Sequence, residues 1–323
     1  MFVSVVVPVY NSEGSLPILV ERLSHALDPD NQLGELILVN DGSRDRSWEV
    51  IGSLAAQYSW IRGFNLMRNY GQHNALLCGI RAARHEVIVT MDDDLQTPPE
   101  EVPAMLARLE EGCDVVYGTP RSEAHGILRN MASRITKLAL QSAMGAETAR
   151  KVSAFRVFRT HLREAFSNYC GPYVSIDVLL TWGTRNFSAI PVRNDRRTIG
   201  VSNYTLGKLL AHAMNMMTGF STVPLQIASF TGFLFTFFGF GVLLYVIGRY
   251  LVQGSAVPGF PFLASVIAIF SGAQLFALGI IGEYLARMHF RLMDRPSYTV
   301  HSQTQSLTAE QGPTIPSTYA NQA

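Results

Sequence analysis

Residues 87–100 of the chain, VIVTMDDDLQTPPE, decide the fold. Their apolar and β-branched beginning, VIVTM, is the pattern of a strand that is buried on both faces of a parallel sheet. The run ends abruptly in Asp92, Asp93 and Asp94, and the Thr-Pro-Pro-Glu sequence that follows predicts the start of a helix. Three carboxylates thus stand at the carboxyl end of a predicted parallel strand. Open α/β sheets bind their ligands at this end.

The three neighbouring carboxylates predict a metal site. Like charges this close repel one another unless a cation holds them. Hard divalent ions such as Mg2+ and Mn2+ take oxygen ligands of this kind. The alternative is a solvated acidic turn, but three acids directly after a buried strand are costly unless they are used.

The composition narrows the classes of protein that fit the chain. It has 323 residues and a formal net charge of +1, so no overall attraction to nucleic acid is expected. Its three cysteines, Cys78, Cys113 and Cys170, form neither a metal-ligand pattern nor a disulfide framework, which suits a reducing compartment. The amino-terminal residues lack the basic segment of a signal peptide, so we expect none.

Short apolar runs alternate with segments of helical periodicity through the first 120 residues. The predicted strands cover residues 3–9, 36–39, 61–66, 86–91 and 113–117. A first predicted helix begins at Ser15, and three more cover residues 47–58, 74–83 and 98–111. This alternation predicts an α/β fold with a parallel, doubly wound sheet. Residues 153–159 and 189–192 are predicted as further extended segments.

Polar residues follow most of these strands and should line one edge of the sheet. Asp41 suits an acceptor for the N–H or ribose groups of a nucleotide, and Glu13 or Asn11 could share that role. Arg68 could reach a phosphate. For each residue alone, ordinary turn chemistry is the alternative. No glycine-rich phosphate loop follows the first strand, which argues against a dinucleotide oxidoreductase and a P-loop enzyme.

Two long apolar stretches, residues 225–251 and 262–285, are each long enough to span ~30 Å of hydrocarbon. Their connector, residues 252–261, has no Lys or Arg, whereas basic residues flank the pair on both outer sides. The positive-inside rule therefore puts the connector outside and both flanks in the cytoplasm. Residues 209–222 are predicted to lie at the membrane interface, and the polar tail after Val300 is predicted to be disordered.

The basic segment before the first span, residues 193–208, has two interpretations. It suits the head group of a phosphorylated lipid, and it equally suits a flank that only orients the helices. The expected organisation is a cytoplasmic domain over residues 1–207, an interfacial helix over 208–224, a two-helix membrane region over 225–286 and a partly disordered cytoplasmic tail over 287–323.

The ordered set of motifs resembles the family 2 glycosyltransferases with a GT-A fold. The motifs are VVVPVYNSE (residues 5–13), VNDGSRDRS (39–47), RNYGQHNAL (68–76), MDDDLQTPPEE (91–101) and RTIGVSNY (197–204). More narrowly, the chain resembles bacterial membrane enzymes that load a sugar onto polyprenyl phosphate. These include undecaprenyl-phosphate aminoarabinose transferases and O-antigen carrier glucosyltransferases.

The resemblance implies a role for each matching residue. The nucleoside would be held by Pro8, Tyr10, Glu13 and Asp41, and an Mg2+ or Mn2+ ion on the donor diphosphate by Asp94 and Asp92. Gln96 would lie near the donor sugar, and the acceptor phosphate would be contacted by Arg197, Ser202 and Tyr204. Asp93 is a further candidate catalytic residue. The implied partners are a nucleotide sugar, most simply a UDP-sugar, polyprenyl phosphate and the membrane, and the resemblance is compatible with homo-oligomers.

Two positions depart from the family pattern. Many relatives carry Gly-Asp shortly before the segment aligned with Phe155-Arg156, where this chain has Val152, Ser153 and Ala154, and they carry Lys where it has Asn203. A phosphate nucleophile has its second pKa near ~6 and needs no base, so inverting transfer to a lipid phosphate stays the predicted reaction. The alternatives are a transferase with a sugar-hydroxyl acceptor and a non-catalytic membrane scaffold or flippase partner. The predicted location is the bacterial inner membrane, with both termini in the cytoplasm.

Overall fold

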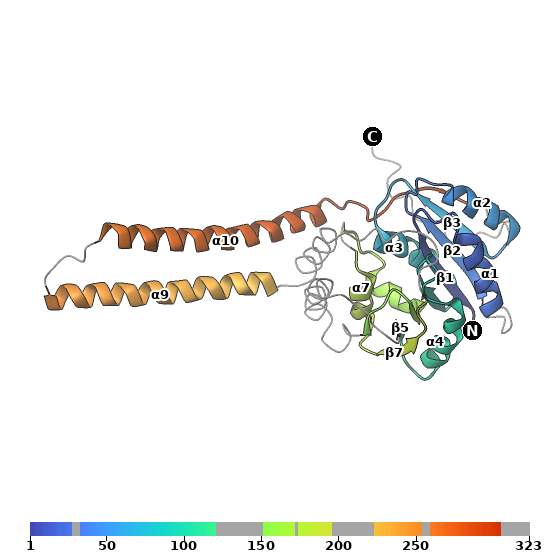
Figure 1. Cartoon of the computed structure of the whole chain (residues 1–323), viewed down its shortest axis with the longest axis horizontal. Helices are drawn as coiled ribbons and strands as arrows, with labels where there is room; N and C mark the ends of the chain where they lie inside the picture. Colours follow the sequence, from blue (N-terminus) through green and yellow to red (C-terminus); the bar gives the residue numbers. More distant parts are fainter. Residues whose placement is uncertain (28–32, 121–150, 172–173, 196–222, 254–258, 305–323) are drawn as a thin grey trace.

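The strands form one mixed sheet, and the helices cover both of its faces (Figure 1). The computed structural model describes residues 1–27, 33–120, 151–171, 174–195, 223–253 and 259–304. In chain order the elements are β1 (Val3–Val9), α1 (Leu16–Leu27), β2 (Leu33–Asn40), α2 (Ser47–Gln57), β3 (Ile61–Leu66), α3 (Gln72–Ala82), β4 (Val87–Thr90), a 3-10 turn (Pro99–Glu101), α4 (Val102–Glu110), β5 (Val115–Pro120), β6 (Arg156–Arg159), a second 3-10 turn (Thr160–Phe166), α7 (Ile176–Gly183), β7 (Phe187–Val192), α9 (Val223–Gln253), α10 (Phe260–Leu292) and β8 (Val300–Gln303).

The strand order is β7-β5-β6-β4-β1-β2-β3-β8. Strand β1 pairs in parallel with β2 and β4, and β2 pairs in parallel with β3. All five strands predicted in the first 120 residues are confirmed. The prediction of a wholly parallel sheet is wrong at β6, which lies antiparallel between β4 and β5, and at β8, which lies antiparallel to β3. An antiparallel neighbour needs no helical crossover, so these two strands join the sheet outside the alternating series.

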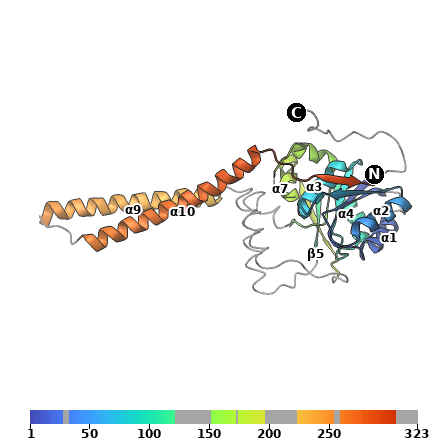
Figure 2. The same cartoon turned by 90° about the horizontal axis from the view of Figure 1, so that it is seen from above.

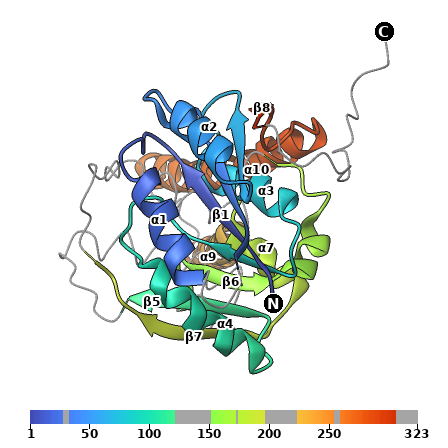
Figure 3. The ribbon, with the colours of Figure 1, turned by 90° about the vertical axis from the view of Figure 1, so that its right-hand side faces the viewer.

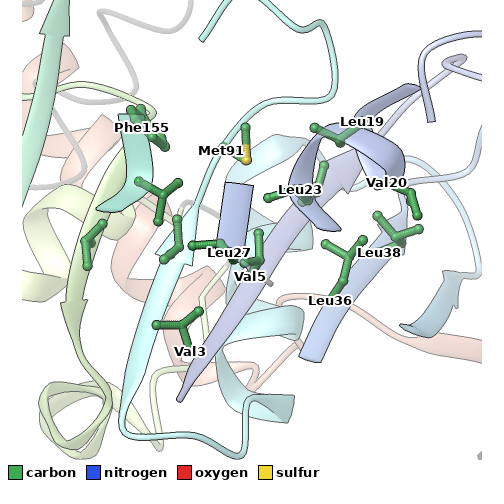
Figure 4. Close-up of a cluster of buried hydrophobic side chains, with 14 of the residues drawn as sticks. Val3, Val5, Leu19, Val20, Leu23, Leu27, Leu36, Leu38, Met91 and Phe155 are labelled. Atoms are coloured by element: carbon green, nitrogen blue, oxygen red, sulfur yellow. The ribbon is translucent and has the colours of Figure 1, made fainter. Parts of the chain in front are cut away.

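The central strand β1 is buried along its whole length, as its apolar sequence predicts. Val3 and Val5 point to the side of the sheet that α1 covers, where they pack with Leu23 and Leu27 (Figure 4). On the opposite side, Val6 packs in the cluster that includes α3 and α7. Each fully buried Val contributes roughly 1.5–3 kcal/mol. The loops that follow the strands are therefore attached to a rigid core.

The helices α9 and α10 form a hairpin that projects away from the sheet and its covering helices, here called the sheet domain (Figures 1 and 2). Each contains a segment long and apolar enough to cross a membrane, Val223–Arg249 and Ile269–His289, and these segments are exposed. The rings of Phe235 and Phe270 meet edge to face at 5.7 Å. Gly239 lets the helices approach, because a Cβ there would stand 2.8 Å from the Phe270 ring. Both predicted spans thus fall within helices.

The chain after Val300 is not disordered throughout, which corrects the prediction for the start of the tail. Val300–Gln303 forms β8 and pairs with β3. A polar four-residue strand suits the edge of a sheet, where one side faces water. The predicted interfacial segment 209–222 and residues 196–208 of the basic segment lie outside the described residues.

Candidate active site

The ends of β1, β2, β3 and β4 bring their loops together at one edge of the sheet. The acidic turn follows β4 directly and is tied to the loop after β1 through Asp93. The backbone N–H of Tyr10 donates to Asp93 Oδ2 at 3.3 Å, and the hydroxyl of Ser12 donates to the same oxygen. Asp93 therefore connects two loops of the site.

The loops after β1 and β2 are joined by reciprocal hydrogen bonds. The Asn11 side chain accepts from the Arg44 backbone at 2.8 Å, and the Asn11 backbone donates to Ser43 Oγ at 3.0 Å. Two residues later in each loop, the Glu13 carboxylate accepts from the Arg46 backbone N–H at 3.0 Å. These bonds fix the loop that carries Tyr10, whose side chain is 37% exposed at the rim.

Asp41 holds the loop after β3. It is 3% exposed, and its two oxygens accept from the backbone N–H groups of Tyr70 at 2.7 Å and Gly71 at 2.8 Å. Burial raises the pKa of the Asp41 carboxyl, and these two hydrogen bonds oppose the rise. Gly71 adopts φ 94°, which favours glycine. Asp41 thus shapes the site even before any contact with a nucleotide.

Gln72 is a site residue to which sequence reasoning gave no role. Its side-chain amide donates to Asp92 Oδ1 at 2.6 Å from the first turn of α3. The signal was present, because Gln72 lies in the RNYGQHNAL motif and begins a helix at the same edge of the sheet. Gln72 orients the first of the three carboxylates.

Gln96 joins the acidic turn to a distant part of the chain. Its backbone N–H donates to Asp94 Oδ1 at 3.1 Å, and its carbonyl accepts from the Asp195 backbone at 2.7 Å. Between them, Leu95 adopts φ 59° with its side chain 6% exposed. A left-handed backbone at a bulky residue stores strain, and surrounding packing must maintain it.

The predicted site residues divide into two groups. Those that the structure describes lie in or directly after the carboxyl ends of β1 to β4, and they are Pro8, Tyr10, Glu13, Asp41, Arg68, Asp92, Asp93, Asp94 and Gln96. The guanidinium of Arg68 lies 4.7 Å from the centre of the Tyr70 ring at the exposed rim. Arg197, Ser202 and Tyr204 lie outside the described residues, so their roles stay predictions.

Comparison with known proteins gives the family. The profile described as glycosyl transferase family 2 matches residues 4–167. The undecaprenyl-phosphate 4-deoxy-4-formamido-L-arabinose transferase of Shewanella sediminis is 36% identical over 302 residues, which cover 93% of this chain and 91% of the relative. The chain belongs to glycosyl transferase family 2.

Other proteins are similar to this family 2 glycosyltransferase. The transferase of the same name from Yersinia enterocolitica is 36% identical and covers 92% of each chain. Among solved structures, that of a mycobacterial protein superimposes with a TM-score of 0.50 at 20% identity, covering 67% of this chain and 72% of its own. This structural likeness concerns the fold, which is the GT-A fold predicted from the sequence.

Residues 152–154, where many relatives have Gly-Asp, contain no carboxylate in this glycosyltransferase. The carbonyl of Ala154 accepts from the Thr90 hydroxyl at 3.1 Å, at the end of β4. Beside it, Arg156 forms a buried ion pair with Asp177 at 2.6 Å.

The acidic turn fits a metal ion that is shared with a ligand. Asp92 and Asp94 offer hard carboxylate oxygens, each oriented by a hydrogen bond from Gln72 or Gln96. Within the described part of the chain, no three His, Cys, Asp or Glu residues gather around one point. Mg2+ is commonly bound by one or two carboxylates, with substrate phosphates and water completing the set. Asp92 and Asp94 would therefore suit an ion that takes its remaining ligands from a bound phosphate group and water, rather than one enclosed by protein ligands alone.

Asp93→Asn should make the stability of the glycosyltransferase less sensitive to pH. Burial raises the pKa of the Asp93 carboxyl, and the neighbouring Asp94 charge adds to the rise. A carboxyl whose pKa is higher folded than unfolded loses stability as the pH rises from its unfolded pKa, near ~3.9, through its folded pKa. The asparagine still accepts from Ser12 and Tyr10. In chelator, the melting temperature of Asp93→Asn minus that of the parent should grow by a few degrees from pH 4 to pH 7, and a constant difference would contradict the assignment.

Proposed function

We propose that this enzyme transfers a sugar from a nucleotide sugar, specifically a UDP-sugar, to polyprenyl phosphate at the membrane surface. The observation that carries the proposal is the position of the acidic turn at the edge of the sheet. Asp92 and Asp94 stand where four parallel strands end, in a chain that continues into two helices of membrane length. The names of the relatives, which specify undecaprenyl phosphate as their acceptor, support a lipid-phosphate acceptor here.

The donor site is built from the loops after β1, β2, β3 and β4. Tyr10 and Asp41 would border the nucleoside, and Asp92 and Asp94 would hold Mg2+ or Mn2+ at the diphosphate. When bound, the ion would offset the negative charge of the leaving diphosphate. Hydrogen bonds from the Gln72 side chain to Asp92 and from the Gln96 backbone to Asp94 fix the orientation of the two carboxylates. This orientation therefore does not have to be established during the reaction.

The acceptor brings its own nucleophile. A phosphomonoester has its second pKa near ~6, so its oxygen is largely deprotonated at neutral pH. A general base is needed only where a hydroxyl must lose a proton. The Ala154 position is therefore compatible with activity. Transfer in a single displacement inverts the anomeric carbon, and the task of the protein is to align the phosphate oxygen with it.

The acceptor end of the site begins at Asp195. Its backbone N–H donates to the Gln96 carbonyl at 2.7 Å, which ties the beginning of the basic segment to the acidic turn. Arg197 follows two residues later, within about 7 Å of extended chain. This proximity supports a role for Arg197, Ser202 and Tyr204 at the lipid phosphate. The positive-inside rule then puts the sheet domain and both termini on the cytoplasmic side of a bacterial inner membrane.

The proposal is tested with the purified full-length chain. It is incubated with undecaprenyl phosphate, Mn2+ and a panel of nucleotide sugars that includes the UDP derivative of 4-deoxy-4-formamido-L-arabinose. Mass spectrometry should then find a lipid product one sugar heavier than undecaprenyl phosphate. The product should not form in EDTA. Transfer only to free sugar hydroxyls would overturn the assigned acceptor.

Arg197→Ala should weaken the use of the lipid more than the use of the nucleotide sugar. Loss of a charge-assisted contact to the acceptor phosphate should raise the KM for undecaprenyl phosphate about tenfold. The KM for the donor should stay nearly constant. The matched control is Arg193→Ala, because the exposed Arg193 lies in the same segment and pairs with Glu101. Equal changes in both KM values would count against an acceptor role.

A further inference from the structure

The segment that follows the second membrane-length helix returns to the sheet domain and lies along its edge. Residues 297–304, here called the return segment, begin five residues after α10 ends and include β8. Figure 3 shows β8 at one margin of the sheet domain, near α2 and the end of α10. Strand β8 pairs with β3, the strand that leads into the Arg68–Gln72 part of the site.

Both ends of the return segment are anchored. At its start, Ser297 is 5% exposed, and its hydroxyl accepts from the Gly171 N–H at 3.2 Å and donates to the Gly171 carbonyl at 3.0 Å. At its end, Thr304 donates its N–H to the Gly63 carbonyl at 3.0 Å and accepts from the Gly63 N–H through Oγ1 at 2.9 Å. Gly63 permits this approach, since a Cβ there would stand 2.9 Å from the Thr304 methyl group.

The middle of the return segment contacts the loop of the donor site. The Met67 N–H, directly after β3, donates to the Thr299 carbonyl at 3.0 Å, and Leu66 pairs with Val300. Residues 67–72, here called the donor loop, carry the groups that hold two carboxylates of the site. Tyr70 and Gly71 donate to Asp41, and Gln72 donates to Asp92.

The beginning of the donor loop is exposed to solvent. Met67 is 58% exposed, and the two residues after it are also exposed. Without β8, β3 would be the edge strand of the sheet, and the end of an unpaired edge strand opens readily. Pairing with β8 fixes the point from which the loop departs. A loop that is ordered before binding loses less entropy when the ligand arrives.

We propose that β8 is a positioning element for the nucleotide-sugar site. By holding the end of β3 and the N–H of Met67, it keeps the donor loop in the arrangement in which the loop donates hydrogen bonds to Asp41 and Asp92. This inference rests on the proposed function, because it assigns the donor loop to the nucleotide sugar. It also links the membrane hairpin to the donor site, since the return segment follows α10 without an intervening element.

Two proline substitutions separate strand pairing from general disturbance. The Thr304 N–H points toward β3, and N–H groups alternate in direction along a strand, so the Ser302 N–H also points toward β3 and that of Gln303 points away. Ser302→Pro removes a pairing bond, whereas Gln303→Pro is the matched control, because proline is tolerated where an edge-strand N–H faces solvent.

In full-length protein, Ser302→Pro should raise the donor KM about tenfold and speed amide exchange in the donor loop by a similar factor. The KM for undecaprenyl phosphate and exchange in β1 and β2 should stay unchanged. Gln303→Pro should match the parent. Unchanged donor-loop exchange in Ser302→Pro, or an equal effect of Gln303→Pro, would overturn the positioning role.

A milder variant covers the case in which Ser302→Pro does not fold. Thr304→Val keeps the shape of the side chain and removes the oxygen to which the Gly63 N–H donates. It should raise the donor KM and donor-loop exchange in the same direction, by about threefold. If both quantities equal those of the parent, the proposal is wrong. Failure of the proposed function would instead appear in the parent, which would neither bind nor use the nucleotide sugar.

Discussion

Asp94→Ala should abolish sugar transfer while leaving the protein folded. Asp94 is one of two carboxylates proposed to hold the ion on the donor diphosphate, and loss of such a charge interaction costs roughly 10³-fold in rate or more. In the structure Asp94 lies in a partly exposed turn, where its side chain accepts from the Gln96 backbone N–H at 3.1 Å. The melting temperature should therefore change little. Initial rates of lipid-product formation at saturating substrates measure the effect.

Two further variants show whether the charge of Asp94 is responsible. Asp94→Asn keeps an oxygen that can accept from Gln96 but removes the negative charge, and it should be nearly as inactive as the alanine variant. Glu111→Ala is the control, because Glu111 is an exposed acid at the far end of α4 and pairs with Arg108. It should have parental activity. A fully active Asp94→Asn would contradict the metal assignment.

The sequence predicted the centre of the sheet well because its strands are buried on both faces. In β1 and β4 every residue is buried, so the apolar runs mark the strands directly. Strand β8 has no such pattern. Its four residues, VHSQ, alternate between half-buried and exposed, and they form a strand because the edge of β3 is available to them. That edge exists only once the rest of the sheet has assembled.

The sequence predicted where the residues of the candidate site lie in the fold, but it did not predict the hydrogen bonds between them. Asp41 and the acidic turn stand at strand ends, where the order of elements alone brings them to one edge. The bonds depend on local backbone geometry. Asp41 reaches two N–H groups because Gly71 adopts φ 94°, and Gln72 meets Asp92 because α3 begins at that point. A pattern of residue types does not contain such angles.

The buried ion pair between Arg156 and Asp177 should be the most damaging place to remove a charge from the described core. The two side chains are 2% and 8% exposed and approach to 2.6 Å. The hydroxyl of Tyr117, which is fully buried, donates to the same Asp177 oxygen at 3.1 Å. Burial raises the pKa of Tyr117 well above its usual value, so the hydroxyl remains a donor.

Asp177→Ala should destabilise the sheet domain by about 3–5 kcal/mol, because it leaves the Arg156 cation buried without its counter-charge. The apparent melting temperature, followed by tryptophan fluorescence of the full-length protein, should fall by about 10 °C. The exposed pair is again the control: Glu111→Ala should change the free energy of unfolding by less than about 1 kcal/mol. A shift no larger than that of the control would show that the ion pair is not needed for stability.

The double variant Arg156→Met with Asp177→Leu separates stability from catalysis. Replacing both charges with apolar side chains of similar volume removes the unpaired cation, so most of the lost stability should return. The hydroxyl of Thr90, at the end of β4, donates to the Ala154 carbonyl. The same carbonyl accepts from Arg156 Nε at 3.4 Å. If the pair serves packing alone, the rescued double variant should transfer sugar at near the parental rate. A stable but inactive double variant would instead show that the pair sets the position of the acidic turn through Ala154 and β4.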